Sequence, residues 1–225
     1  MTTKINKVAC VGLGKMGSVL AKKLLERGFN LVVYNRTKEK MQPLLAMGAR
    51  GAASPKEAAA EADVVLTSLF DDKSVLEVAN GEDGLLAGLK QDAIHIGTST
   101  ILPKTSKLLT ELHRDKKTIY IAGNVLGVPK AAEKGELTSI IAGHSGSIKL
   151  CEPIFNAYSK TILNVGEEPY KANVMKICTN YFLATSIECM GELYTFAEKN
   201  ELDVHYIQDM FKTIFAHPAY KLVLQ

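Results

Sequence analysis

The feature that most constrains the fold is a glycine-rich turn near the start of the chain, between an apolar strand pattern and an amphipathic helix pattern. The run Val8-Ala9-Cys10-Val11 leads into Gly12-Leu13-Gly14-Lys15-Met16-Gly17, and a helical pattern covers residues 18–27. In such a unit the first glycine allows a tight turn, the second lets the backbone approach a pyrophosphate, and the third lets the helix pack on the strand. Helix N-termini favour phosphate groups. The six residues of the turn are therefore predicted to bind a dinucleotide; the alternative is an ordinary strand–helix turn.

The end of the second predicted strand, Asn30–Tyr34, indicates which dinucleotide would be bound. A carboxylate about 20 residues after the glycines binds the ribose hydroxyls of NAD, whereas an Arg accommodates the additional phosphate of NADP. This chain has Asn35, Arg36 and Thr37 at that position and no acid. Arg36 can offer a planar fork to phosphate oxygens, with its two neighbours as neutral hydrogen-bonding partners. The alternative is that Asn35 opens a loop and Thr37 caps the next helix, and both interpretations can hold together. The sequence predicts NADP.

Length and composition set broad limits on the class of protein. The 225 residues can form one large α/β domain and part of a second. The net charge of +3 does not suggest a nucleic-acid partner, and no apolar run approaches the ~20 residues of a membrane span. The four cysteines form no C-x-x-C pair and are interpreted as reduced core thiols. We expect a cytoplasmic protein without a signal peptide and without a metal site.

Strand and helix patterns alternate through the first two-thirds of the chain. This alternation predicts a Rossmann-type, doubly wound parallel sheet with helices between the strands. Helix-start signals include Ser54-Pro55 and Pro103, the latter before a helix over residues 104–116. The predicted strands are Lys7–Val11, Asn30–Tyr34, Val64–Leu69, Ala93–Gly97, Thr118–Ala122, Thr138–Ala142 and Thr161–Val165.

A change of character after Val165 predicts a second, all-helical domain. Gly166-Glu167-Glu168-Pro169 is a helix-start signal, and a helix of about 45 Å is expected over residues 170–199. Because this helix is apolar on nearly all sides, we expect it to be buried against another domain or subunit. A further helix is predicted over residues 204–215. The predicted division is therefore a dinucleotide-binding domain over 1–165 and a partial helical domain, for substrate binding and dimerisation, over 166–225.

The long helix carries a group of polar residues on one face. Asn173, Lys176 and Asn180 are three and then four residues apart, so they share that face among apolar neighbours. Lysine is rarely buried without a partner, and partial desolvation lowers its pKa, which suits proton transfer near neutral pH. The pattern suggests a reactive site, and the alternative is a narrow solvated stripe on a packed helix.

Four motifs, in order and spacing, resemble those of the β-hydroxyacid dehydrogenase family. They are Gly12–Gly17, Ser99-Thr100-Ile101-Leu102-Pro103, Val125-Leu126-Gly127-Val128-Pro129 and Lys176-x-x-x-Asn180. The family includes 3-hydroxyisobutyrate dehydrogenases, tartronate semialdehyde reductases and glyoxylate/succinic semialdehyde reductases. The resemblance covers the whole chain. It implies hydride transfer between NADP and a small semialdehyde or 2-keto acid.

The resemblance also implies roles for individual residues. Lys176 would be the catalytic acid/base, and Asn180 would orient the substrate or the lysine. Gly127, with the backbone around Leu126, would bind the substrate carboxylate. The residues added to the cofactor site are Leu69, Phe70, Ser74 and Thr100. Those assigned to the substrate site are Ser99, Thr100, Leu126, Gly127, Lys176 and Asn180.

Several positions depart from the family pattern. Leu126 replaces a serine that many members use for the carboxylate, which suggests a more apolar pocket. Tyr170 and Ala172 stand where two glycines commonly precede the lysine, and Gly97 replaces a frequent Asp. Members generally continue further, so either the chain is truncated or a partner subunit completes the site, and we expect a homodimer in either case. The alternatives are an imine reductase-like enzyme and a non-catalytic NADPH-binding relative.

Overall fold

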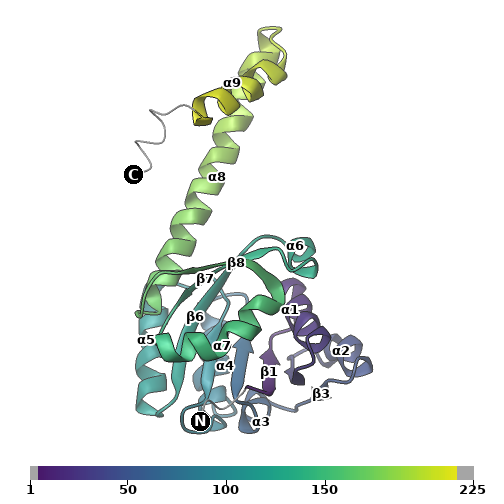
Figure 1. The fold of residues 1–225 in the computed structure, drawn as a ribbon, viewed down its shortest axis with the longest axis vertical. Helices are drawn as coiled ribbons and strands as arrows, with labels where there is room; N and C mark the ends of the chain where they lie inside the picture. Colours follow the sequence, from purple (N-terminus) through teal and green to yellow (C-terminus); the bar gives the residue numbers. More distant parts are fainter. Residues whose placement is uncertain (1–4, 217–225) are drawn as a thin grey trace. The chain divides into compact units, whose positions relative to one another are not determined.

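An eight-stranded sheet is formed between residues 7 and 164 in a computed structural model, which describes residues 5–216 (Figure 1). The strand order is β3-β2-β1-β4-β5-β6-β7-β8. Its first six strands have the order of a Rossmann sheet, so the predicted fold class is confirmed. The strands are β1 (Lys7–Val11), β2 (Asn30–Tyr34), β3 (Arg50–Gly51), β4 (Val64–Thr67), β5 (Ile94–Gly97), β6 (Ile119–Leu126), β7 (Leu137–Ala142) and β8 (Ser159–Asn164).

The direction of the last two strands differs from the sequence-based expectation. Strands β1 to β6 are parallel, but β7 pairs with β6 in the antiparallel sense, and β8 runs parallel to β7. Residues 127–136 connect β6 to β7 and contain only the short helix α6 (Pro129–Glu133). A parallel crossover needs a dozen or more residues, so this connection returns the chain in the opposite direction.

Helices cover both faces of the sheet, because successive strand residues point to opposite faces and both sets are apolar. On one face, α1 and α7 pack over β1, β4, β5 and β6 (Figure 1). On the other face lie α3, α4 and α5. The helices of these layers are α1 (Lys15–Glu26), α3 (Pro55–Ala60), α4 (Asp72–Asn80), α5 (Pro103–Asp115) and α7 (Ser145–Tyr158), with α2 (Gln42–Ala46) and two 3-10 turns, η1 (Lys38–Met41) and η2 (Leu85–Ala87), between them.

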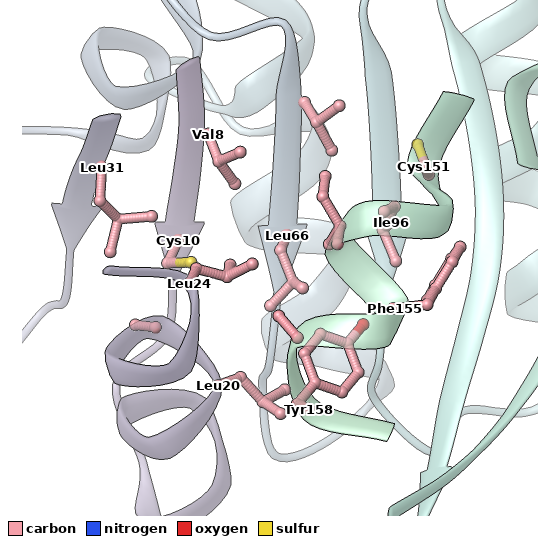
Figure 2. Close-up of a cluster of buried hydrophobic side chains, with 14 of the residues drawn as sticks. Val8, Cys10, Leu20, Leu24, Leu31, Leu66, Ile96, Cys151, Phe155 and Tyr158 are labelled. Atoms are coloured by element: carbon pink, nitrogen blue, oxygen red, sulfur yellow. The ribbon is translucent and has the colours of Figure 1, made fainter. Parts of the chain in front are cut away.

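The largest apolar cluster lies between the sheet and the α1–α7 layer. Figure 2 shows Leu20 and Leu24 of α1 together with Phe155 and Tyr158 of α7, all near strand residues such as Leu66. Each of these five side chains is at most 1% exposed. Removing this much apolar surface from water is the main stabilising contribution to the unit that contains the sheet.

The chain divides into two compact units within the long helix α8 (Tyr170–Lys199), one ending at Ile177 and the other starting at Cys178. The helix has the predicted length, and α9 (Val204–Ala216) follows it. The predicted functional division at residue 165 stays a prediction. The cysteine interpretation holds for Cys10 and Cys151, which are buried, but is wrong for Cys178 and Cys189. Both lie on α8 and are exposed. Among the described residues, no helix is long and apolar enough to cross a membrane.

Candidate functional site

A cleft of about 500 Å³ lies at the carboxyl ends of β1, β2 and β4. In open α/β sheets ligands bind in this region, where the strand order reverses. The turn after β1, the loop after β2, the loop after β4 and helix α4 all contribute to its lining. Of the residues predicted for the cofactor, those that line the cleft are Gly12, Gly14, Asn35, Arg36, Thr37, Leu69, Phe70 and Ser74.

The glycines of the first turn leave space that a dinucleotide would need. Gly12 has φ +91°, and a Cβ there would collide with the backbone oxygen of Ser68. A Cβ on Gly17 would collide with the backbone oxygen of Gly12, so helix α1 can approach β1 only without one. A Cβ on Gly14 would have no atom within 4 Å. No side chain caps the N-terminus of α1, and its first turn carries no acid. Its N–H groups therefore suit a pyrophosphate.

Asn35 connects the glycine turn to the loop after β2. Its Oδ1 accepts a hydrogen bond from the Leu13 N–H at 2.9 Å, and its Nδ2 donates to the Thr37 backbone oxygen at 2.9 Å. Thr37 precedes η1, but its side chain makes no capping hydrogen bond, so the alternative interpretation of Thr37 as a cap is wrong. Asn35 therefore holds the loop in shape, which leaves the Arg36 and Thr37 side chains exposed beside the cleft.

Lys40 is a cleft residue that the sequence interpretation missed. It lies four residues after Arg36 and lines the same cleft. Neither cation forms an ion pair with a carboxylate in the part of the chain that the structure describes. No helical spacing links the two residues, because Arg36 precedes the 3-10 turn η1 that contains Lys40. The other cleft residues not predicted are Val11, Tyr34, Pro55, Ser68, Glu77, Val78, Gly81, Glu82, Asp83 and Gly84.

Some of the remaining residues predicted for the cofactor lie at the cleft, and others do not. Phe70 is 94% exposed at the cleft, and Ser74 forms a capping box with Asp71 at the start of α4. The residues that do not line the cleft are Leu13, Lys15, Met16, Gly17 and Thr100. Leu13 and Gly17 are buried beneath the turn and act on it through the backbone.

The predicted substrate residues follow β5 and β6, the next strands along the sheet. Ser99 is buried, and its Oγ accepts a hydrogen bond from the Leu69 N–H at 2.8 Å. Thr100, the next residue, is exposed. After β6, Leu126 is half-buried, and Gly127 has φ +126°, a conformation that favours glycine. These loops lie at the same edge of the sheet as the cleft, because parallel strands end at one edge.

Lys176 lies on α8, within the first unit. It is half-buried, and this burial lowers the pKa of its ammonium group. Asn173, one turn earlier, is fully buried, and Asn180, one turn later, is exposed. The start of the helix is held on α5, where the Lys107 Nζ lies 4.4 Å from the centre of the Tyr170 ring. Tyr170 thus provides a cation–π contact at a position where the family commonly has glycine.

Comparison with known proteins agrees with this geometry. Residues 7–166 match the family described as the NAD binding domain of 6-phosphogluconate dehydrogenase. An uncharacterized oxidoreductase of Bacillus subtilis, YfjR, is 40% identical over 215 residues, which are 96% of this chain and 75% of the relative. The chain belongs to the β-hydroxyacid dehydrogenase family. It is thus an oxidoreductase-family protein whose first unit binds a nicotinamide dinucleotide.

Two further relatives indicate the range of the family. Glyoxylate/succinic semialdehyde reductase 2 of Arabidopsis thaliana is 28% identical, and the match covers 90% of this chain and 56% of the relative. The chain thus spans about half the length of that enzyme. A solved structure of Psf3 with NADP+ and 2-OPP has a TM-score of 0.80 and 30% identity, covering 96% of this chain and 76% of Psf3.

Proposed function

We propose that this β-hydroxyacid dehydrogenase relative is an NADP-dependent oxidoreductase that interconverts a small semialdehyde or 2-keto acid and the corresponding hydroxy acid. The observation that carries the proposal is Lys176, a half-buried lysine with a lowered pKa on the helix that follows a dinucleotide-binding unit. The names of the Arabidopsis reductase and of the family support the substrate class.

The preference for NADP rests on the loop after β2. Arg36 and Lys40 place two positive charges at the cleft, without a carboxylate at the end of the strand. A guanidinium offers two parallel N–H groups to phosphate oxygens, and an ammonium adds a point charge. Thr37 supplies a hydroxyl between them. The Psf3 structure, which contains NADP+, is consistent with this preference.

Lys176 would serve as the acid/base of the reaction. The bound nicotinamide would supply or accept the hydride. In the reducing direction the Lys176 ammonium would donate a proton to the oxygen that develops negative charge, and in the oxidising direction the neutral amine would accept it. A pKa lowered by burial makes both protonation states accessible nearer neutral pH. Asn180, one turn later on α8, would orient the substrate or the lysine.

The substrate end would be formed by the loops after β5 and β6. We assign Ser99 and Thr100 to the first loop, and Leu126 and Gly127 to the second, where backbone N–H groups would hold a carboxylate. Leu126 and the 63% exposed Val128 would make this pocket more apolar than is usual in the family. This composition would favour a bulkier or less charged carbonyl compound.

A homodimer is part of the proposal. Large apolar side chains on α8 are exposed, including Tyr181, Phe182 and Ile187, each at least 65% exposed. Soluble proteins rarely leave extended apolar surface uncovered, and two-fold symmetric dimers are the most common homo-oligomers. A second copy of the chain would therefore bury this surface.

The test is NADPH oxidation against glyoxylate, succinic semialdehyde, tartronate semialdehyde and methylmalonate semialdehyde. We expect turnover of at least one compound. Lys176→Met should lower kcat by roughly 10²- to 10⁴-fold, the contribution typical of a general acid. NADPH affinity, measured by titration, should stay nearly unchanged.

Lys171→Met is the matched control, since Lys171 is an exposed lysine on the same helix and should retain wild-type turnover. Wild-type turnover by Lys176→Met would contradict the assignment. No turnover of any compound by the wild type, with tight NADPH binding, would favour a non-catalytic relative.

A further inference from the structure

Asn124 connects the ends of three neighbouring strands. It lies on β6 and is fully buried, and its Nδ2 donates a hydrogen bond to the backbone oxygen of Ser99 at 2.8 Å. The Ser99 Oγ accepts in turn from the Leu69 N–H at 2.8 Å. Ser99 follows β5 and Leu69 follows β4, where it lines the cleft. The chain of contacts therefore runs from β6 to the wall of the nucleotide cleft.

The second polar atom of the Asn124 side chain is unsatisfied. Its Oδ1 is buried and has no hydrogen-bond partner among the described residues. Leaving a buried acceptor unpaired costs roughly 1–3 kcal/mol, so such an atom requires an explanation. The same face of β6 carries Tyr120 and Ala122, which belong to an apolar cluster. A residue that only filled space here would be more favourable if it were apolar.

The contact to Ser99 gives Asn124 a role beyond packing. We propose that Asn124 is a positioning residue for the reaction, acting through the backbone of Ser99 on the exposed Thr100 that follows it. This inference rests on the proposed function and identifies a residue that the four family motifs do not include. Holding Ser99 from both sides would keep Thr100 and the cleft residue Leu69 at a constant separation.

The loop is also held at two other points, so the Asn124 contact has a defined local effect. The Leu102 N–H donates to the Asp72 Oδ1 at 3.0 Å, and the Thr98 Oγ1 donates to the Thr67 backbone oxygen at 2.8 Å. Loss of the Asn124 contact would release the segment between these two anchors without detaching the whole loop. A displacement of about 1 Å at a reacting centre can lower the rate by about 100-fold.

The test uses Asn124→Leu, which removes both amide atoms and keeps a similar volume. We expect kcat to fall by roughly 10- to 100-fold. The dissociation constant for NADPH should change by less than about 3-fold, because the glycine turn and the Arg36 loop are untouched. Hydrogen exchange measured by mass spectrometry should accelerate in residues 66–72 and 97–103. The matched control is Ser139→Ala on β7, which removes a buried hydrogen bond to Ser159 at 2.7 Å without touching the loop. It should leave kcat unchanged.

A double-mutant cycle separates positioning from loss of stability. If Asn124 acts through Thr100, the substitution Asn124→Leu should lower kcat by less than about 2-fold in a Thr100→Ala background. Additive effects, or unchanged exchange in both segments, would overturn the inference. A loss of activity with equally accelerated hydrogen exchange throughout the sheet would also overturn the inference, because it would indicate a general loss of stability. If the wild type reduces no carbonyl compound, the proposed function fails, and the positioning role for that reaction fails with it. The exchange experiment would then still report whether the contact holds the loop.

Discussion

The two compact units differ in how far their apolar side chains are buried. In the unit up to Ile177, strand residues on both faces of the sheet are covered by helices, and many are completely buried. In the unit from Cys178 on, Phe182 and Phe196 are 66% and 69% exposed. The first unit thus has a complete core of its own. The second has a small apolar hollow between α8 and α9 and an additional apolar surface that nothing in the described chain covers.

Truncating one phenylalanine in each unit should give the largest effect and the clearest contrast. Phe155 is completely buried between α7 and the sheet, so Phe155→Ala should lower the free energy of unfolding by about 3–5 kcal/mol (Figure 2). Phe196→Ala, at an exposed position, should lower it by less than about 0.5 kcal/mol. Urea unfolding followed by circular dichroism measures both. Similar losses of free energy of unfolding in the two variants would contradict the prediction and show that Phe196 belongs to a packed core.

A buried histidine pair in the first unit should make stability dependent on pH. The His95 Nδ1 and the His113 Nε2 lie 2.9 Å apart, and hydroxyls of Thr67 and Thr118 bond to the outer ring nitrogens. Burial lowers the pKa of His113 from 6.5 to about 4, and burial together with the neighbouring ring lowers the pKa of His95 well below 6.5. Both side chains are therefore neutral in the folded protein near pH 7.

The sign of the effect follows from the proton balance. Between pH 6.5 and about 4 the unfolded chain binds a proton that the folded His113 does not, so the free energy of unfolding falls as the pH falls. The loss from His113 amounts to about 3 kcal/mol across this range. Urea unfolding at several pH values between 7.5 and 4 measures it. His205→Asn, at an exposed position in the second unit, should leave this acid-dependent loss unchanged. A pH-independent unfolding midpoint would contradict the prediction.

Much of the first unit could be predicted from local patterns, and the exceptions have physical causes. The strand β1, the helix α8 and the glycine turn follow from hydrophobic periodicity and from the demands of a positive φ. The two-residue strand β3 was not predicted, because it is too short to show a hydrophobic period. The reversed direction of β7 depends on the length of a connection, which periodicity does not report.

The residues of the candidate site likewise fall into two groups, those that sequence patterns predict and those that only the folded structure shows. Arg36 could be predicted because its position relative to the glycines fixes its place in the unit. Lys40 was missed because it lies in the 3-10 turn η1, which only the folded structure places at the cleft. Asn124 could not be found from sequence, because its contact with Ser99 joins two residues that are 25 positions apart in the chain. Cleft residues from α4 and the turn after it, such as Glu77, are likewise brought there only by tertiary packing.

The nucleotide cleft of the first unit carries the positively charged side chains of Arg36 and Lys40, and cofactor affinity should show what this charge does. Lys40→Ala should raise the KM for NADPH by roughly 10-fold, since a hydrogen bond to a charged group contributes about 1.5–3 kcal/mol. The KM for NADH should stay the same. Lys38→Ala is the control, because Lys38 is exposed two residues earlier and does not line the cleft. Equal effects on both cofactors would contradict a contact with the additional phosphate.

The smallest effect on folding should come from the exposed face of α8, and there the change should appear in assembly instead. Phe182→Ser exchanges a 66% exposed ring for a small polar side chain, so the free energy of unfolding of the sheet, followed by hydrogen exchange of its strands, should change by less than about 0.5 kcal/mol. If a second copy covers this face, the substitution removes apolar contact area from the interface, and the fraction of dimer in analytical ultracentrifugation should fall at micromolar concentration. The conservative variant Phe182→Leu should remain dimeric. A wild-type protein that is monomeric throughout this range would refute the homodimer, and the apolar face would then need a different partner.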